Sequence, residues 1–425
     1  MNNKILLTTA LIAASMVTVA QNRTAVDKNN VAYAITGDGS NDFIWMNIRQ
    51  VDLGTGQVTQ TIFERSKTNF QLTDVQSKRS VNQTAITNGN VFASPDYPTG
   101  TLVAAAAYDR NSNKLFFTPM RRGELRWLDL NVKNETPQFF TMQSDLMKVG
   151  NPADESNHIT RMVIGADGNG YALSNDANRF LKFTTGKKPV ITELGNIVDA
   201  DSKSGTSIHN KCSSWGGDMI ADAFGKLYVI SANHNVFMID INTRIATFKG
   251  TITGLPAGYT TNAAAVDANG DIVVSSANKF DGYFKLKLSD LAASRIEGSD
   301  VKYNASDFAN GNLLLQKEAD AANKFSMVNS KLPVLDVVKG DAKVFPNPVT
   351  NGSFNVLFDE KKEGRYTIVV SDLAGRILQT KVVSIVKGMQ TERINLNANA
   401  AKGVYMVKVL DENKQAFINE KIIVQ

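Results

Sequence analysis

The sequence has few of the residues on which most metal sites and disulfide-stabilised folds depend. It contains one cysteine and three histidines among 425 residues. A disulfide framework within the chain and a cysteine-rich zinc site are therefore excluded. His158, His209 and His234 have no His or Cys neighbour at metal-ligand spacing. Because zinc needs three or four such ligands, we expect no metal site.

Other functional signatures are missing as well. No G-x-S-x-G motif, P-loop or dinucleotide fingerprint is present, so we expect no cofactor. The 46 Lys and Arg against 41 Asp and Glu leave a net charge of +5. A nucleic-acid-binding protein concentrates far more positive charge, so nucleic acid is not expected as a partner. What is present, 43% hydrophobic and 20% charged residues, is enough for a sizeable core, and the length predicts two or three domains.

The one long apolar run lies at the N-terminus. Met1–Lys4 carries a positive charge, Ile5–Val19 is apolar or small without charge, and Thr18–Ala20 offers small residues. This pattern is typical of a secretory signal peptide, which we assign to residues 1–20. A run of about fifteen residues is short for a membrane span of about 20, and no later segment qualifies. In an exported chain we expect the single thiol, Cys212, to be packed and inert.

The middle of the chain repeats a β unit, and no long stretch keeps a helical period of 3.6 residues. The unit is an apolar strand ending in Asp, a tight polar turn and a second apolar strand. Its aspartates, 45 to 58 residues apart, are Asp109, Asp167, Asp222 and Asp267. That spacing is close to the length of a four-stranded propeller blade. A degenerate fifth copy occupies residues 305–315.

The chain ends of this region complement each other. Val31–Ile35, Phe43–Leu53 and Val58–Phe63 look like the last three strands of a blade that lacks its first strand. The copy at 305–315 can supply that strand, which closes the ring and removes two sheet edges. We therefore predict an all-β fold in which residues 21–330 form a β-propeller of five blades, with six as the alternative. The other architecture considered is an array of β-sandwiches.

A linker at 331–340 precedes a different pattern in residues 341–425. Its segments are Val344–Pro348, Tyr366–Arg376, Gly403–Val409 and Lys421–Gln425. The strands alternate polar and apolar residues, Asp372–Gly375 has the composition of a hairpin turn, and two prolines mark the entry. These features predict a small antiparallel β-sandwich.

The same segments resemble the type A C-terminal sorting domain of the type IX (Por) secretion system of Bacteroidetes. The matching residues are Pro346, Asn347 and Pro348 of a YPNP-like start, Asp372 and Gly375 of the hairpin, Gly403 and Tyr405 of a G-x-Y-x-V-x-V strand, and Lys421 of the terminal strand. Phe345 stands where the family usually has Tyr. The resemblance implies export through the periplasm by the type IX translocon and its sortase machinery. The protein would be secreted or attached to the outer-membrane surface.

The ligand site of a propeller is expected at the loops that enter its innermost strands. These loops are Gly100–Leu102, His158–Arg161, His209–Asp218 and Tyr259–Asn262. From them we select as candidate ligand-binding residues His158, Arg161, His209, Trp215 and Asp218. Such side chains can stack on and hydrogen-bond a sugar or peptide. The structural alternative is that Trp215 only packs between blades.

Two further segments are open to interpretation. Asp267–Asp271 has the start of a calcium loop, but a hairpin turn is favoured because Asp, Asn and Gly recur at this place in other blades. Residues 65–103 are predicted to be a long surface insertion, because they contain few apolar residues.

Two function classes remain. The first is an extracellular binding or adhesion module for a glycan or protein, which the lack of any recognisable catalytic constellation favours. The alternative is a secreted hydrolase or lyase that degrades polysaccharide or peptide at the propeller mouth. Two carboxylates about 5–10 Å apart in a deep pocket would favour glycoside cleavage.

Overall fold

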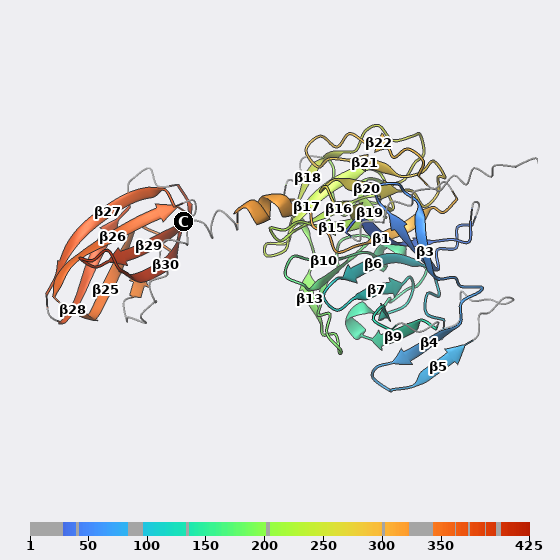
Figure 1. Ribbon diagram of the computed structural model, residues 1–425, viewed down its shortest axis with the longest axis horizontal. Coiled ribbons are helices and arrows are strands. Elements are labelled where there is room, and N and C mark those ends of the chain that lie inside the picture. Colours follow the sequence, from blue (N-terminus) through green and yellow to red (C-terminus); the bar gives the residue numbers. More distant parts are fainter. Residues whose placement is uncertain are drawn as a thin grey trace, which may run out of the picture. The chain divides into compact units, whose positions relative to one another are not determined.

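The computed structural model describes residues 29–39, 42–83, 97–132, 136–200, 205–299, 302–322, 343–361, 363–372, 375–386, 388–396 and 401–425. The predicted signal peptide and the linker at 331–340 lie outside these ranges. The chain divides into two compact units, Met1–Asp320 and Ala321–Gln425 (Figure 1). Across the described residues, no helix combines the length and apolarity that a membrane span requires.

The described part of the first unit forms five sheets arranged in a ring. Each sheet is a blade with an innermost strand, in the order β23 (Ala305–Ala309), β6 (Val103–Asp109), β10 (Ile159–Ile164), β15 (Asp218–Ala221) and β19 (Ala263–Val266). Each innermost strand contacts the next, and β19 returns to β23. The unit is therefore a five-bladed β-propeller, as predicted.

Three further strands complete each blade outward from the axis. They are β1 (Val31–Thr36), β2 (Asn47–Asp52) and β3 (Val58–Phe63) in blade 1; β7 (Lys114–Pro119), β8 (Glu124–Asp129) and β9 (Gln138–Gln143) in blade 2; β11 (Gly170–Ser174), β12 (Phe180–Phe183) and β13 (Ile191–Gly195) in blade 3; β16 (Lys226–Ile230), β17 (Asn235–Asp240) and β18 (Ile245–Thr251) in blade 4; and β20 (Ile272–Ser275), β21 (Phe284–Leu286) and β22 (Ser294–Arg295) in blade 5.

Blade 1 closes the ring with strands from both ends of the propeller sequence. β23 pairs antiparallel with β1, and Phe308 lies opposite Ala34 in the register. This is the closure that the sequence predicted. Asp307 lies within β23, opposite Ile35.

The repeated aspartates build the inner hairpins. The carboxylates of Asp109, Asp167, Asp222 and Asp267 each accept a backbone N–H from the residue two positions later, at 2.8 to 3.1 Å. This is an Asx turn, which substitutes a side-chain oxygen for a backbone one. Asp267 also accepts from Asp271 N at 2.9 Å, so its geometry is that of the turns in the other blades.

Where the structure describes it, at 65–83 and 97–103, the segment differs from the predicted surface insertion, and residues 84–96 of that prediction lie outside the described ranges. β4 (Phe70–Asp74) pairs parallel with β9 and antiparallel with β5 (Ser80–Gln83), which extends blade 2 outward (Figure 1). Phe70, Leu72 and Tyr97 are buried in the core that blades 1 and 2 share. Three well-spaced apolar side chains are enough to hold the hairpin, although the segment is polar on average.

The second unit is a sandwich of two antiparallel sheets, as predicted. One sheet contains β24 (Lys343–Phe345), β25 (Ser353–Lys361) and β28 (Gly388–Asn395). The other contains β27 (Ile377–Ile385), β26 (Gly364–Asp372), β29 (Gly403–Leu410) and β30 (Ala416–Val424). Alternate side chains of both sheets, among them Phe354, Ile368 and Val407, form a common core.

Candidate functional site

The strand order defines two faces of the propeller. The loop face carries the segments that enter the innermost strands and those that join the second and third strands of each blade. The hairpin face carries the inner hairpin turns. Of the five predicted site residues, His158, His209 and Trp215 lie in the loop-face segments that enter β10 and β15, and Arg161 and Asp218 lie on those two strands.

Arg161, on β10, is fully buried and bonds backbone carbonyls. Its guanidinium donates to Ser174 O at 3.2 Å, Asn175 O at 3.3 Å, Gly216 O at 3.1 Å and also to Ser214 O. Burial lowers its pKa to about 10. These bonds tie the segment before β15 to blade 3 and occupy the donors that a ligand would need.

His209 and Trp215 are likewise engaged within the protein. The His209 ring lies 2.7 Å from Asp176 O through Nδ1, and Trp215 Nε1 donates to His209 O at 3.2 Å. The Lys211 ammonium lies 4.9 Å from the centre of the half-buried Trp215 ring. His158 is buried, and burial lowers its pKa. His209 and Trp215 therefore mainly fix the loops, whereas neither ring nitrogen of the buried His158 has a hydrogen-bond partner among the described residues.

The expectation for Cys212 was wrong, because its side chain is exposed. It lies in α1 (Lys211–Ser214), a single helical turn that begins after Asn210. The Asn210 side chain accepts a hydrogen bond from Cys212 N at 2.8 Å. Since so short a helix packs only one side against the blade, the thiol faces solvent.

Asp218 belongs to a buried carboxyl pair that the sequence did not reveal. Its carboxylate accepts N–H groups from Met219 at 2.6 Å, Ala264 at 2.7 Å and Phe308 at 3.1 Å, which links blades 4, 5 and 1. Burial raises the pKa of Asp218 to about 7. Burial, followed by repulsion from Asp218, raises the pKa of Asp307 well above its usual range. Both side chains have no exposed surface, so a polymer cannot reach them.

The most exposed aromatic surface of the loop face lies at blades 1 and 5. Phe43, between β1 and β2, is 47% exposed. Its ring centre lies 6.4 Å from that of Trp45 and 6.3 Å from that of Phe280, between β20 and β21. We call these three residues the aromatic ledge. The sequence did not indicate the ledge, because the Phe-Ile-Trp run has the composition of the start of a buried strand.

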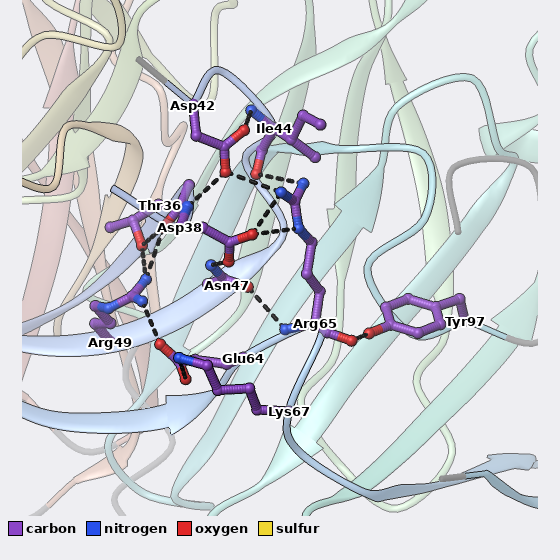
Figure 2. A network of polar contacts seen from close by, with 11 residues as sticks. Thr36, Asp38, Asp42, Ile44, Asn47, Arg49, Glu64, Arg65, Lys67 and Tyr97 are labelled. Carbon is purple, nitrogen blue, oxygen red and sulfur yellow. Dashed lines mark hydrogen bonds and ion pairs between the residues drawn. The ribbon is translucent and has the colours of Figure 1, made fainter. Parts of the chain in front are cut away.

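A network of charges fixes the loop that carries Phe43 (Figure 2). Arg65 donates to Asp38 Oδ2 at 2.6 Å and to Asp42 Oδ2 at 2.9 Å, and Asn47 Nδ2 donates to Asp38 Oδ1 at 2.6 Å. Burial alone would raise the pKa of Asp38, but the bonds from Asn47 and Arg65 hold it below its usual value. Asp42 Oδ1 accepts Ile44 N at 3.1 Å. The ledge is thus preorganised and bordered by polar groups.

The sorting-motif residues lie at one end of the sandwich. Asn347, between Pro346 and Pro348, donates from Nδ2 to Lys421 O at 2.7 Å and accepts Ile423 N at 3.0 Å. Its amide therefore pairs with β30 as a backbone would.

The hairpin and strand motifs meet at the same end. Asp372 Oδ1 accepts Arg376 N at 2.9 Å, and Gly375 supplies the positive φ of +81° that the turn needs. Across the sheet Asp372 lies opposite Tyr405, and Gly403 lies opposite Val424.

Comparison with known proteins supports the assignment of this second unit. Residues 343–425 match the family model of the secretion system C-terminal sorting domain. The resemblance seen in the sequence is confirmed. The chain carries the sorting signal of type IX secretion, and it is exported and either secreted or attached to the outer-membrane surface.

No curated protein matches the chain. Among solved structures, PorZ, a surface component of the type IX secretion system of Porphyromonas gingivalis, is 14% identical with a TM-score of 0.32. The alignment covers 92% of this chain and 51% of PorZ, so the chain spans about half the length of PorZ. Virginiamycin B lyase from Staphylococcus aureus is 11% identical with a TM-score of 0.30, and the alignment covers 76% of this chain and 84% of the lyase. A streptogramin B lyase is 12% identical with a TM-score of 0.33, and the alignment covers 64% of this chain and 83% of that lyase. Likenesses this weak carry no argument about activity.

Proposed function

We propose that the propeller is an extracellular binding module, exported by its sorting domain, that holds a glycan on the aromatic ledge. The observation that carries this proposal is the exposure of Phe43 beside fixed carboxylate and amide groups. A sugar presents an apolar ring face and a rim of hydroxyls. A flat aromatic ring with polar groups at its edge complements both.

The rigidity of the ledge favours binding. Phe43 and Trp45 lie on a loop fixed by Arg65, and Phe280 comes from the neighbouring blade. A surface ordered before binding avoids most of the entropy cost of immobilising loops. The enzyme alternative would need free carboxylates at the mouth, whereas Asp38 and Asp42 both pair with Arg65, and Asp218 and Asp307 are fully buried. We therefore propose that the propeller binds its ligand and does not cleave it as a hydrolase or lyase would.

The test is binding of the exported protein to a glycan array, followed by titration of the best ligand. Phe43→Ala is expected to weaken that binding about tenfold, because a stacked ring contributes about 0.5–1.5 kcal/mol. Phe224→Ala is the matched control, since Phe224 is 56% exposed in the blade 4 hairpin on the opposite face. Unchanged binding by the Phe43 variant, or capture of a protein partner with no glycan bound, would refute the proposal.

The sorting domain has its own partners. We infer that residues 343–425 contact the type IX translocon and its sortase machinery, which the family match supports. This part of the proposal is independent of the ligand of the propeller.

A further inference from the structure

A hollow lies on the hairpin face of the propeller, between blades 1 and 2. Its volume is about 520 Å³, and its walls include Tyr33, Gln50, Tyr108 and Arg110, with Asn29 and Gly311. Ligand pockets in proteins typically measure about 300–1,000 Å³ and combine aromatic walls with a few polar groups. The cavity therefore has both the size and the lining of a small-molecule site.

The two tyrosines form one wall of this cavity. Their ring centres lie 4.8 Å apart with the planes tilted by 52°, and Tyr108 OH donates to Asn113 Oδ1 at 2.8 Å. Burial is the first cause that raises the pKa of both hydroxyls. They are thus neutral at physiological pH, and Arg110 is the one charged group among the described lining residues.

Contacts with Asn312 and Gly311 hold Arg110 in place. Its Nη2 donates to Asn312 Oδ1 at 2.6 Å, while Asn312 Nδ2 donates to Asn29 O at 2.7 Å and Val266 O at 2.8 Å. A Cβ at position 311 would lie 3.0 Å from Arg110 Cβ and Nε, so Gly311 allows the close approach. One bond occupies one of five guanidinium donors. The fork can still receive a carboxylate through two parallel bonds.

A larger hollow of about 630 Å³ shares Asn29, Arg110 and Gly311 with the first and extends toward blade 5. Its lining carries Lys287 and Lys317 besides Arg110, but also Asp267, Asp271 and Glu318, so its charges balance. Arg110 therefore stands where two hollows meet, and on the side of the smaller hollow no described lining residue carries a negative charge. A ligand spanning both would place its anionic group at Arg110 and neutral polar groups beyond.

We propose that this Arg110 cavity binds an acidic sugar unit, with the carboxylate on the guanidinium and the sugar ring against Tyr33 and Tyr108. A single arginine matches a single carboxylate in charge, and its planar fork matches it in shape. Gln50 supplies an amide for the hydroxyls. The site lies on the face opposite the aromatic ledge, so it does not depend on the glycan proposed there.

The test titrates the exported protein with digalacturonic acid, using galactobiose as the uncharged counterpart, by calorimetry. Digalacturonic acid is expected to bind at least tenfold more tightly. Arg110→Gln is expected to abolish this difference, while Arg121→Gln, an exposed arginine on the loop face of the same blade, keeps it. Thermal melting verifies that each variant is folded. Equal affinity for the two sugars, or an Arg110→Gln variant that binds as the unsubstituted protein does, would overturn the proposal. Phe43→Ala separates the sites, because it is expected to leave this titration unchanged.

Discussion

The buried carboxyl pair makes the stability of the propeller fall as pH rises. Asp218 and Asp307 have no exposed surface, and burial raises the pKa of Asp218 from 3.8 to about 7. Asp307 is raised as well, first by burial and then by Asp218. In the unfolded chain both carboxyls ionise near pH 4. The folded state therefore binds protons that the unfolded state has already released, and base favours unfolding.

The size of the effect follows from that difference. A shift of one pKa unit corresponds to about 1.36 kcal/mol. The rise from 3.8 to about 7 for Asp218 amounts to about 4 kcal/mol, present below pH 4 and lost as pH rises through 7. Between pH 5 and pH 8 about 3 kcal/mol of this is lost. For a large domain that lowers the Tm by roughly 6 °C, at about 2 °C per kcal/mol.

The window above pH 5 excludes the opposing carboxylates but includes one opposing histidine. Asp38 and Asp240 have a lowered pKa in the folded protein. Such groups stabilise the fold above the pKa of the unfolded chain and lose that effect as pH falls, so they act mainly below pH 4. His158 also has a lowered pKa in the folded protein, so its contribution to stability grows as pH rises toward the ordinary value of 6.5. Thermal melts of the exported protein, followed by circular dichroism from pH 5 to pH 8, therefore report the sum of the pair and His158, and variants of the pair separate the two.

Two isosteric variants assign the effect. Asp307→Asn removes one ionisable group but leaves Asp218 buried, so we expect the Tm to fall less steeply with pH without becoming flat. Asp218→Asn turns an amide NH2 group toward backbone N–H groups that one carboxylate oxygen had accepted, so we expect a loss of about 2–4 kcal/mol at pH 5 and the loss of the share of the slope that Asp218 contributes. Asp267→Asn, in a hairpin turn, should keep the slope of the unsubstituted protein. A Tm that rises with pH, or an Asp218→Asn variant that keeps the full slope of the unsubstituted protein, would refute the reasoning.

Three further predictions concern single contacts. Asn347→Ala removes both side-chain bonds to β30 and is expected to destabilise the sorting domain by about 1–2 kcal/mol. Immunoblots should then show less protein in the medium. Asn419→Ala, which changes an exposed residue of β30, should have no effect. Arg161→Met leaves several buried carbonyls without a donor, so urea unfolding of the propeller should show a loss of about 2–4 kcal/mol, and unchanged stability would contradict the bracing role. Cys212 should react fully with a maleimide in the folded protein, whereas labelling that requires denaturant would show a buried thiol.

The blade pattern could be predicted from the sequence because its determinants are local. An Asp that caps its own turn and the apolar strands beside it can be recognised within about fifteen residues. The role of Asp307 could not be predicted, since its partner Asp218 meets it only when β23 closes the ring. Trp215 and His209 looked like ligand residues, but the His209 ring contacts Asp176 O from another blade, and Trp215 Nε1 donates to His209 O.

Repetition separates bracing residues from candidates for binding. Arg49 in Asn47–Asp52 and Arg126 in Glu124–Asp129 hold the same position in two blades, and each buried guanidinium pairs with a carboxylate, at 2.8 and 2.6 Å. A residue found at the same position in several blades serves the packing that the blades share. Arg110 has no counterpart in the other blades and keeps exposed atoms. Phe43 lies in the loop between the second and third strands of blade 1, as Phe280 does in blade 5, so its exposure of 47% is what singles it out. Arg161 also lacks a counterpart, yet its burial removes it from contact with any ligand. Sequence can supply the first criterion, whereas exposure depends on the folded neighbours, so both criteria point to Arg110 and exposure points to Phe43.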